Sequence, residues 1–220
     1  MTGRALVLSG PFGMGHTMMA EAAEDVLAAA GWQVRRRDSM QLLGPVAGRS
    51  GDLLFHGLLR VPGLYDAVHF AHLRTGSRLA VAMDRQARRR LVPALRAELE
   101  EHPADLVLSV FATGASAAAG LKQEQPSRRT VVLCTDVAVH RLWVHRGTDL
   151  FLVTSAAAEA SVRRYCPDAL VAQVPAPVRT GFAAAPSRPR ARADLRIEPD
   201  APCALLVDSG WGLGPVVTAA

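Results

Sequence analysis

Short apolar runs alternate with helical patterns along most of the chain, and this alternation limits the possible folds more than any other feature. An apolar run of about five residues that ends at a turn is typical of a strand buried on both faces of a sheet. Apolar residues three and four positions apart are typical of a helix with one buried face. Strands that alternate with helices predict an α/β fold, with a mostly parallel, Rossmann-like sheet covered by helices on both faces.

The first forty residues show this alternation most clearly. Residues 5–9 (ALVLS) predict a strand, and a glycine-rich turn separates them from a helix predicted over residues 16–30. Gly31 is the expected stop of that helix. A second strand is expected over residues 33–37, which completes a βαβ unit with a right-handed crossover.

The same alternation returns after residue 76, beginning with a long helix predicted over residues 77–101. The further strands are predicted over residues 105–111, 130–134, 149–153 and 169–174, and the further helices over residues 114–123 and 156–165. Together these elements predict one complete parallel α/β domain.

The composition changes after residue 175, where Pro, Arg and Ala become frequent. We expect a complete domain over residues 1–175 and a linker over residues 176–202. Residues 203–207 (CALLV) predict the first strand of a second α/β domain, which we place at residues 203–220. A length of 220 residues allows one full domain and part of another. We therefore expect the second domain to be incomplete and the chain to be inactive alone.

The composition also excludes several classes of protein. Half of the residues are apolar and a fifth are charged, which excludes a disordered or fibrous chain. The three cysteines show no CxxC spacing, which argues against a zinc knuckle or a disulfide scaffold and favours the reducing cytoplasm. No apolar stretch reaches the length of about 18 residues needed to span a bilayer, so we expect any membrane contact to be peripheral.

Positive charge gathers in one segment. The chain has 24 Arg, one Lys and a formal net charge of +5, whereas residues 49–96 alone hold nine Arg and three Asp. Arginines among apolar side chains suit the headgroup region of an anionic membrane, although a solvated helix face is the alternative. Nucleic acid is not an expected partner, because aromatic residues are few and no recognition motif is present.

The glycine-rich turn over residues 9–16 lies at the carboxyl end of the first predicted strand. Open α/β sheets bind ligands at this edge, where a helix N-terminus favours negative charge. Gly13 and Gly15 would let a ligand approach the backbone. The turn lacks the third glycine of the dinucleotide fingerprint, so we do not expect a nicotinamide site.

His16 stands at the start of the first predicted helix. The positive end of a helix disfavours the imidazolium ion, so the ring is expected to stay neutral and able to accept a proton. A neutral imidazole is suited to act as a general base toward a hydroxyl group. The alternative is a histidine that caps the helix or fills the wall of the crevice.

A second polar segment, residues 134–145 (CTDVAVHRLWVH), follows the strand predicted over residues 130–134. Asp136, His140 and His145 could be read as metal ligands, but we favour hydrogen bonds to the loop backbone. Trp143 is either a packing residue or the wall of an acceptor pocket.

Four motifs occur in an order that resembles one family. They are Gly15-His16, the run over residues 135–145, Pro-Val-Arg at residues 177–179, and GWGLG at residues 210–214. The chain resembles the monogalactosyldiacylglycerol synthase and processive diacylglycerol glucosyltransferase family, itself similar to the N-acetylglucosaminyltransferase that makes lipid II. The resemblance implies a GT-B fold, in which the N-terminal domain binds a lipid acceptor and the C-terminal domain binds a nucleotide sugar.

The resemblance also implies roles for particular residues. His16 matches the proposed general base. The residues matching the acceptor side of the cleft are Gly13, Gly15, Thr135, Asp136, His140 and Trp143, and those matching the donor side are Gly210 and Gly212. Met14 stands where the family commonly has glycine.

The expected reaction is an inverting hexosyl transfer from a UDP-sugar to a diacylglycerol-type lipid, in glycolipid synthesis at the inner face of the cell membrane. No metal or other cofactor is expected, because dipoles and cations can stabilise the leaving diphosphate. Two alternatives remain open: a non-catalytic module that binds lipid surfaces, and an epimerase or hydrolase that acts on a nucleotide sugar.

Overall fold

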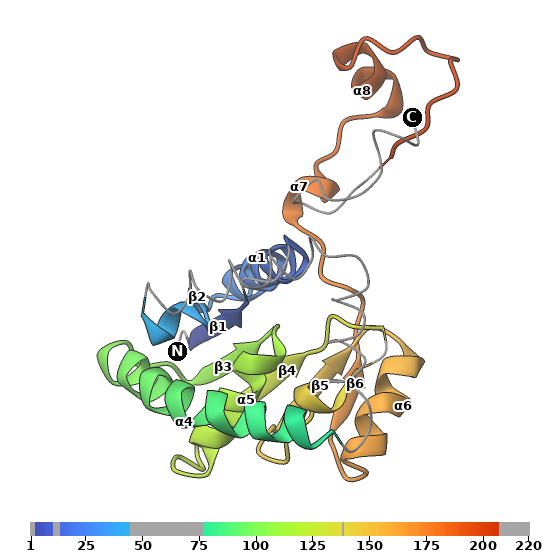
Figure 1. The fold of residues 1–220 in the computed structure, drawn as a ribbon. Coiled ribbons are helices and arrows are strands. Elements are labelled where there is room, and N and C mark those ends of the chain that lie inside the picture. The colour runs from blue at the N-terminus through green and yellow to red at the C-terminus, as the bar shows by residue number, and fades with distance from the viewer. Residues whose placement is uncertain (1–2, 11–13, 45–76, 138, 207–220) are drawn as a thin grey trace.

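The computed structural model describes residues 3–10, 14–44, 77–137 and 139–206. Within these ranges one sheet contains the strands β1 (Arg4–Ser9), β2 (Gln33–Asp38), β3 (Leu106–Ser109), β4 (Arg129–Leu133), β5 (Leu150–Val153) and β6 (Val171–Gln173). All neighbouring strands are parallel, in the order β2-β1-β3-β4-β5-β6 (Figure 1). The predicted Rossmann-like α/β fold is confirmed, and it is consistent with the N-terminal domain of a GT-B enzyme.

Helices cover both faces of this sheet (Figure 1). The described helices are α1 (Met14–Ala29), α4 (Arg78–Glu101), α5 (Ala112–Lys122), α6 (Ala156–Tyr165), α7 (Thr180–Ala183) and α8 (Arg188–Asp194), with short 3-10 turns η1 (Gln41–Leu43) and η2 (Arg141–Trp143). Helix α1 ends as predicted, since Gly31 has a φ of 84°, a conformation that favours glycine.

The alternation of side chains along β1 divides the core into layers. Leu6 and Leu8 pack with Leu91 and Leu95 of α4 on one face of the sheet. Val7 points to the opposite face and packs with residues of α1. Because successive side chains of a strand point to opposite faces, the uniformly apolar run in β1 serves both layers.

Up to β6, the strands and helices of the structure match those predicted from the sequence, and the predicted and observed bounds differ only at the ends of the elements. The strand predicted over residues 105–111 is shorter because the chain turns at Val110 and Phe111. Helix α5 therefore begins at Ala112, two residues before its predicted start.

The region after β6 differs from the prediction. The expected linker, residues 176–202, contains the short helices α7 and α8. Residues 203–206 are not a buried strand: they have no strand hydrogen bonding, and Leu205 is 85% exposed. The described residues contain no second sheet with which this segment could pair. Its apolar side chains therefore have, among these residues, no second sheet or helix layer against which to be buried. Gly13, Gly210, Gly212 and residues 49–76 of the basic segment lie outside the described residues.

None of the helices in the described ranges combines the length and the apolar character needed to cross a membrane.

Gly10 provides a test of the packing between β1 and β3. A Cβ atom at Gly10 would lie 2.3 Å from ring carbons of Phe111, whereas a Cβ at Gly15 would meet nothing within 4 Å. Gly10→Ala is expected to lower the free energy of unfolding by about 1–3 kcal/mol, because the Phe111 ring must move in a close-packed core. Chemical denaturation measures this change.

Gly15→Ala is the matched control for this prediction. Gly15 lies in the first turn of α1, where alanine is a better helix former, so stability should be unchanged or slightly raised. Equal stability of the two variants would contradict the predicted steric conflict at Gly10.

Candidate functional site

The order of the strands creates one point where several loops meet. The chain leaves β1 through α1 toward β2 on one side, and leaves β3 through α5 toward β4 on the other. In open α/β sheets this reversal opens a crevice at the carboxyl ends of the strands, where ligands bind. His16 follows β1, Phe111 follows β3 and Thr135 follows β4, so all three reach this edge.

His16 is anchored through one of its two ring nitrogens. Its Nδ1 lies 3.0 Å from the carbonyl oxygen of Val110 and 3.3 Å from Oγ1 of Thr135. A carbonyl oxygen can only accept a hydrogen bond, so Nδ1 carries the proton and donates it. The Nε2 atom of the neutral ring therefore keeps its lone pair and can accept a proton.

The surroundings of His16 favour the neutral ring. Burial lowers the pKa of His16 below its ordinary value, and the hydrogen bond to Val110 and the Asp136 carboxylate oppose this shift to a smaller extent. The edge of the ring meets Phe111 with centroids 4.9 Å apart. A neutral ring was expected from the position of His16 at a helix N-terminus, but the main physical cause is burial.

Asp136 lies beside Trp143 and His140. The indole Nε1 of Trp143 donates a hydrogen bond of 2.8 Å to Oδ2 of Asp136. The Nε2 atom of His140 lies 3.5 Å from the same oxygen. Because the Asp136 side chain is 35% exposed, its carboxylate lies at the surface of the site.

Trp143 is buried in the core of the domain. Its side chain is 1% exposed and packs in a core cluster with Val132, Phe151 and Val153. Of the two interpretations drawn from the sequence, the structure favours the packing residue. The sequence could not separate them, because the burial of Trp143 depends on strands β4 and β5 beneath it.

His145 is a buried residue of the same segment. Its Nε2 is 2.9 Å from the Leu142 carbonyl, and burial lowers its pKa while Asp84 of α4 opposes this shift. Asp84 in turn accepts a hydrogen bond of 2.6 Å from Ser116 Oγ. Asp136, His140 and His145 thus do not converge, and the described part of the chain contains no cluster of three or more metal-ligating side chains.

Cys134, Gly10 and Gly15 also lie at this edge of the sheet. Burial, with a smaller contribution from Asp136, raises the pKa of the Cys134 thiol to about 12, so Cys134 is not a nucleophile. Gly10 is a residue whose importance sequence reasoning missed, since its contact with Phe111 joins segments a hundred residues apart in the chain. The space around Gly15 leaves its backbone open to approach.

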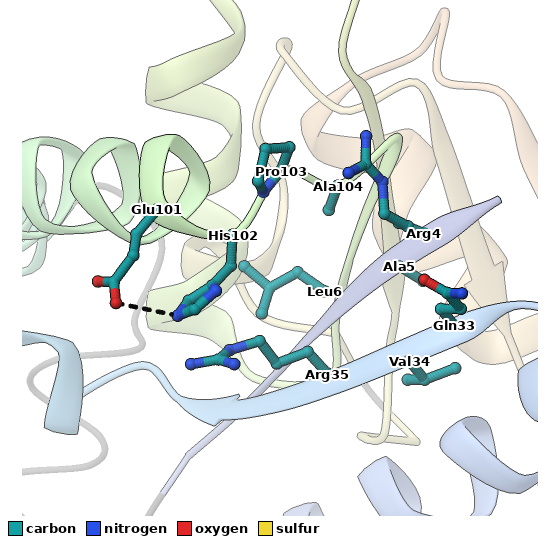
Figure 2. A pocket seen from close by; sticks show the side chains of 10 residues that line it. All are labelled: Arg4, Ala5, Leu6, Gln33, Val34, Arg35, Glu101, His102, Pro103 and Ala104. Atoms are coloured by element: carbon teal, nitrogen blue, oxygen red, sulfur yellow. Dashed lines mark ion pairs between the residues drawn. The ribbon is translucent and has the colours of Figure 1, made fainter.

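A separate hollow of about 260 Å³ lies at the amino ends of β1 and β2 (Figure 2). Arg4, Arg35 and His102 contribute to its lining, and His102 Nε2 lies 3.3 Å from Glu101 Oε1. This hollow is at the opposite edge of the sheet from His16. Parallel α/β sheets place their ligands at the carboxyl edge, so the candidate site is the His16 edge.

The state of His16 can be measured directly. In NMR titrations of the chain, His16 is expected to titrate below the ordinary histidine pKa of about 6.5. The nitrogen shifts of its neutral form should show the proton on Nδ1, because the Val110 carbonyl accepts it. A His16→Gln variant assigns the resonance, and a proton found on Nε2 would contradict the proposed anchoring.

The family model described as Monogalactosyldiacylglycerol (MGDG) synthase matches residues 31–165, more than half of the chain. A search of curated proteins found no significant match. The matched region includes Thr135, Asp136, His140 and Trp143 but begins after His16. On this evidence the chain belongs to the MGDG synthase family, a family of glycosyltransferases that act on a lipid acceptor.

Proposed function

We propose that this chain is the acceptor side of a glycosyltransferase that moves a hexosyl group from a UDP-sugar to the hydroxyl of a diacylglycerol-type lipid, with His16 as the general base. The observation that carries the proposal is the anchoring of His16. Its Nδ1 lies 3.0 Å from the Val110 carbonyl, which leaves Nε2 as the proton acceptor at the ligand-binding edge of the sheet.

In the proposed reaction, Nε2 of His16 removes the proton of the lipid hydroxyl as its oxygen attacks the anomeric carbon. The new carbon–oxygen bond forms while the bond to the UDP leaving group breaks, so the configuration inverts. The ring becomes an imidazolium ion whose Nδ1–H stays on Val110. A positioned general base contributes about 10²–10⁴-fold to such a rate.

The nucleotide sugar would bind across the cleft, at a second domain for which Gly210 and Gly212 are the proposed loop residues. The lipid acceptor would reach His16 from a membrane surface. The proposed reaction involves no metal ion, because helix dipoles and cations of the donor side can stabilise the leaving diphosphate.

Contact with an anionic membrane at the cytoplasmic face is part of the proposal. Arg85, Arg89 and Arg90 are exposed on α4, and Val81 of the same helix is 53% exposed. Exposed arginines next to apolar side chains suit peripheral binding to anionic lipid headgroups.

The general-base assignment is tested with His16→Gln. Turnover is expected to fall by about 10²–10⁴-fold with nucleotide-sugar binding unchanged, because only the proton acceptor is lost. UDP release in the presence of diacylglycerol vesicles measures turnover; if the chain alone is inactive, it is joined to a donor-binding domain of the family. Unchanged turnover would remove His16 from this role. Release that does not depend on diacylglycerol would favour the hydrolase alternative, and epimerised sugar without acceptor would favour an epimerase.

The membrane contact is tested by cosedimentation with vesicles that contain anionic lipid. The double variant Arg89→Gln/Arg90→Gln is expected to bind about tenfold or more weakly, since each arginine near the surface contributes about 1 kcal/mol. The matched control is Arg163→Gln/Arg164→Gln, which removes two exposed arginines from α6. Equal loss in the two double variants would contradict a specific role for α4.

A further inference from the structure

The roles of Asp136 and Trp143 follow from contacts that connect them to His16. Trp143 Nε1 donates to Asp136 Oδ2 at 2.8 Å, and the Trp143 ring centroid lies 6.1 Å from that of His16. The hydroxyl of Thr135, the residue before Asp136, lies 3.3 Å from His16 Nδ1, and the Asp136 carboxylate raises the pKa of His16 against the larger effect of burial. Trp143, Asp136 and His16 are therefore neighbours at one edge of the sheet, with Trp143 hydrogen-bonded to Asp136 and its ring near that of His16.

The contact with Trp143 limits the positions that the Asp136 carboxylate can take. Asp136 lies in a loop between the buried residues Cys134 and Val139, and its immediate neighbour Val137 is 72% exposed. The indole, by contrast, is fixed in a core cluster that includes Val132 and Phe151. An indole N–H in the core needs a hydrogen-bond acceptor, and in this structure Asp136 is that acceptor.

The groups near His16 come from three parts of the fold: the segment after β3, the segment after β4, and the turn η2. The Val110 carbonyl and the Phe111 ring follow β3, while the Thr135 hydroxyl and the Asp136 carboxylate follow β4. Trp143 of η2 lies behind them, with the His140 ring 6.2 Å from the indole. Among these described groups Asp136 carries the negative charge, and His140 is the other titratable side chain nearby.

We propose that Trp143 is a positioning residue that holds the Asp136 carboxylate near His16, and that Asp136 stabilises the imidazolium ion formed during transfer. This inference rests on the proposed function of His16 as general base. Asp136 takes no proton itself: the proton moves from the lipid hydroxyl to Nε2 of His16, and the positive charge then forms near the carboxylate. The two residues thereby make proton transfer more favourable without contacting the lipid.

The proposal is tested by NMR titration of His16 in the chain, which requires no activity. Asp136→Asn removes the charge and keeps an amide oxygen for the indole, so the pKa of His16 should fall, because the carboxylate that favours the charged ring is lost. An unchanged pKa in Asp136→Asn would overturn the role of Asp136.

Trp143→Phe keeps an aromatic ring and removes the N–H donor. It is expected to lower the pKa of His16 when Asp136 is present and to have little effect in the Asp136→Asn background, because the indole acts through the carboxylate. Equal shifts in the two backgrounds would show that Trp143 acts through packing alone and would overturn its positioning role.

A second measurement keeps the proposal testable if Trp143→Phe does not fold. In the unmodified chain, the indole Nε1 proton of Trp143 should be protected from solvent exchange, and Asp136→Ala should reduce this protection at least tenfold. Unchanged protection would overturn the hydrogen bond on which the proposal depends.

Kinetics separate this proposal from the proposed function. Trp143→Phe should lower kcat and leave KM for diacylglycerol unchanged, since the indole is buried. A raised KM with unchanged kcat would return Trp143 to the wall of the acceptor pocket and overturn its positioning role. If His16→Gln keeps full turnover while the pKa changes occur as expected, general-base catalysis fails and the electrostatic contact stands.

Discussion

The parallel pairing of β1 with β3 positions the candidate site of this molecule. Ala5 of β1 pairs with Leu106 of β3, a separation of about a hundred residues in the chain. β2 lies on one side of this pair and β4 on the other, and in open α/β sheets such a reversal of strand order marks the ligand-binding position at the carboxyl edge. The same pairing brings the Val110 carbonyl to His16 and the Phe111 ring to Gly10. The position and the protonation state of the candidate base therefore depend on this pairing.

The candidate site combines a buried side and an exposed side. His16 is partly buried, which keeps its ring neutral, whereas Asp136 is held near the surface by the buried indole of Trp143. A neutral base beside a fixed carboxylate can take a proton at a small electrostatic cost, since the charge that appears has a partner already in place. This arrangement is compatible with the lipid-directed glycosyltransferases of the family to which the chain belongs.

Much of the fold could be predicted from local patterns. The short apolar runs are uniform because β1 and β3 are covered on both faces, and the end of α1 follows from the positive φ of Gly31. Local patterns failed where an element lacked a tertiary partner: residues 203–206 have an apolar run like that of β1 but no neighbouring strand in the described structure. They failed as well for α7 and α8, whose Pro- and Arg-rich segment shows no apolar periodicity.

The sequence by itself determined the class of fold, the candidate residues and their placement after successive strands. These features depend on the spacing of apolar residues and on the order of strands and helices along the chain. The tertiary structure decided which nitrogen of His16 carries the proton and that both Trp143 and His145 are buried. These outcomes depend on contacts between residues far apart in the chain, such as Val110 with His16 and Thr135 with His16. Such contacts arise from the pairing order of the strands, which the pattern of any single segment does not specify.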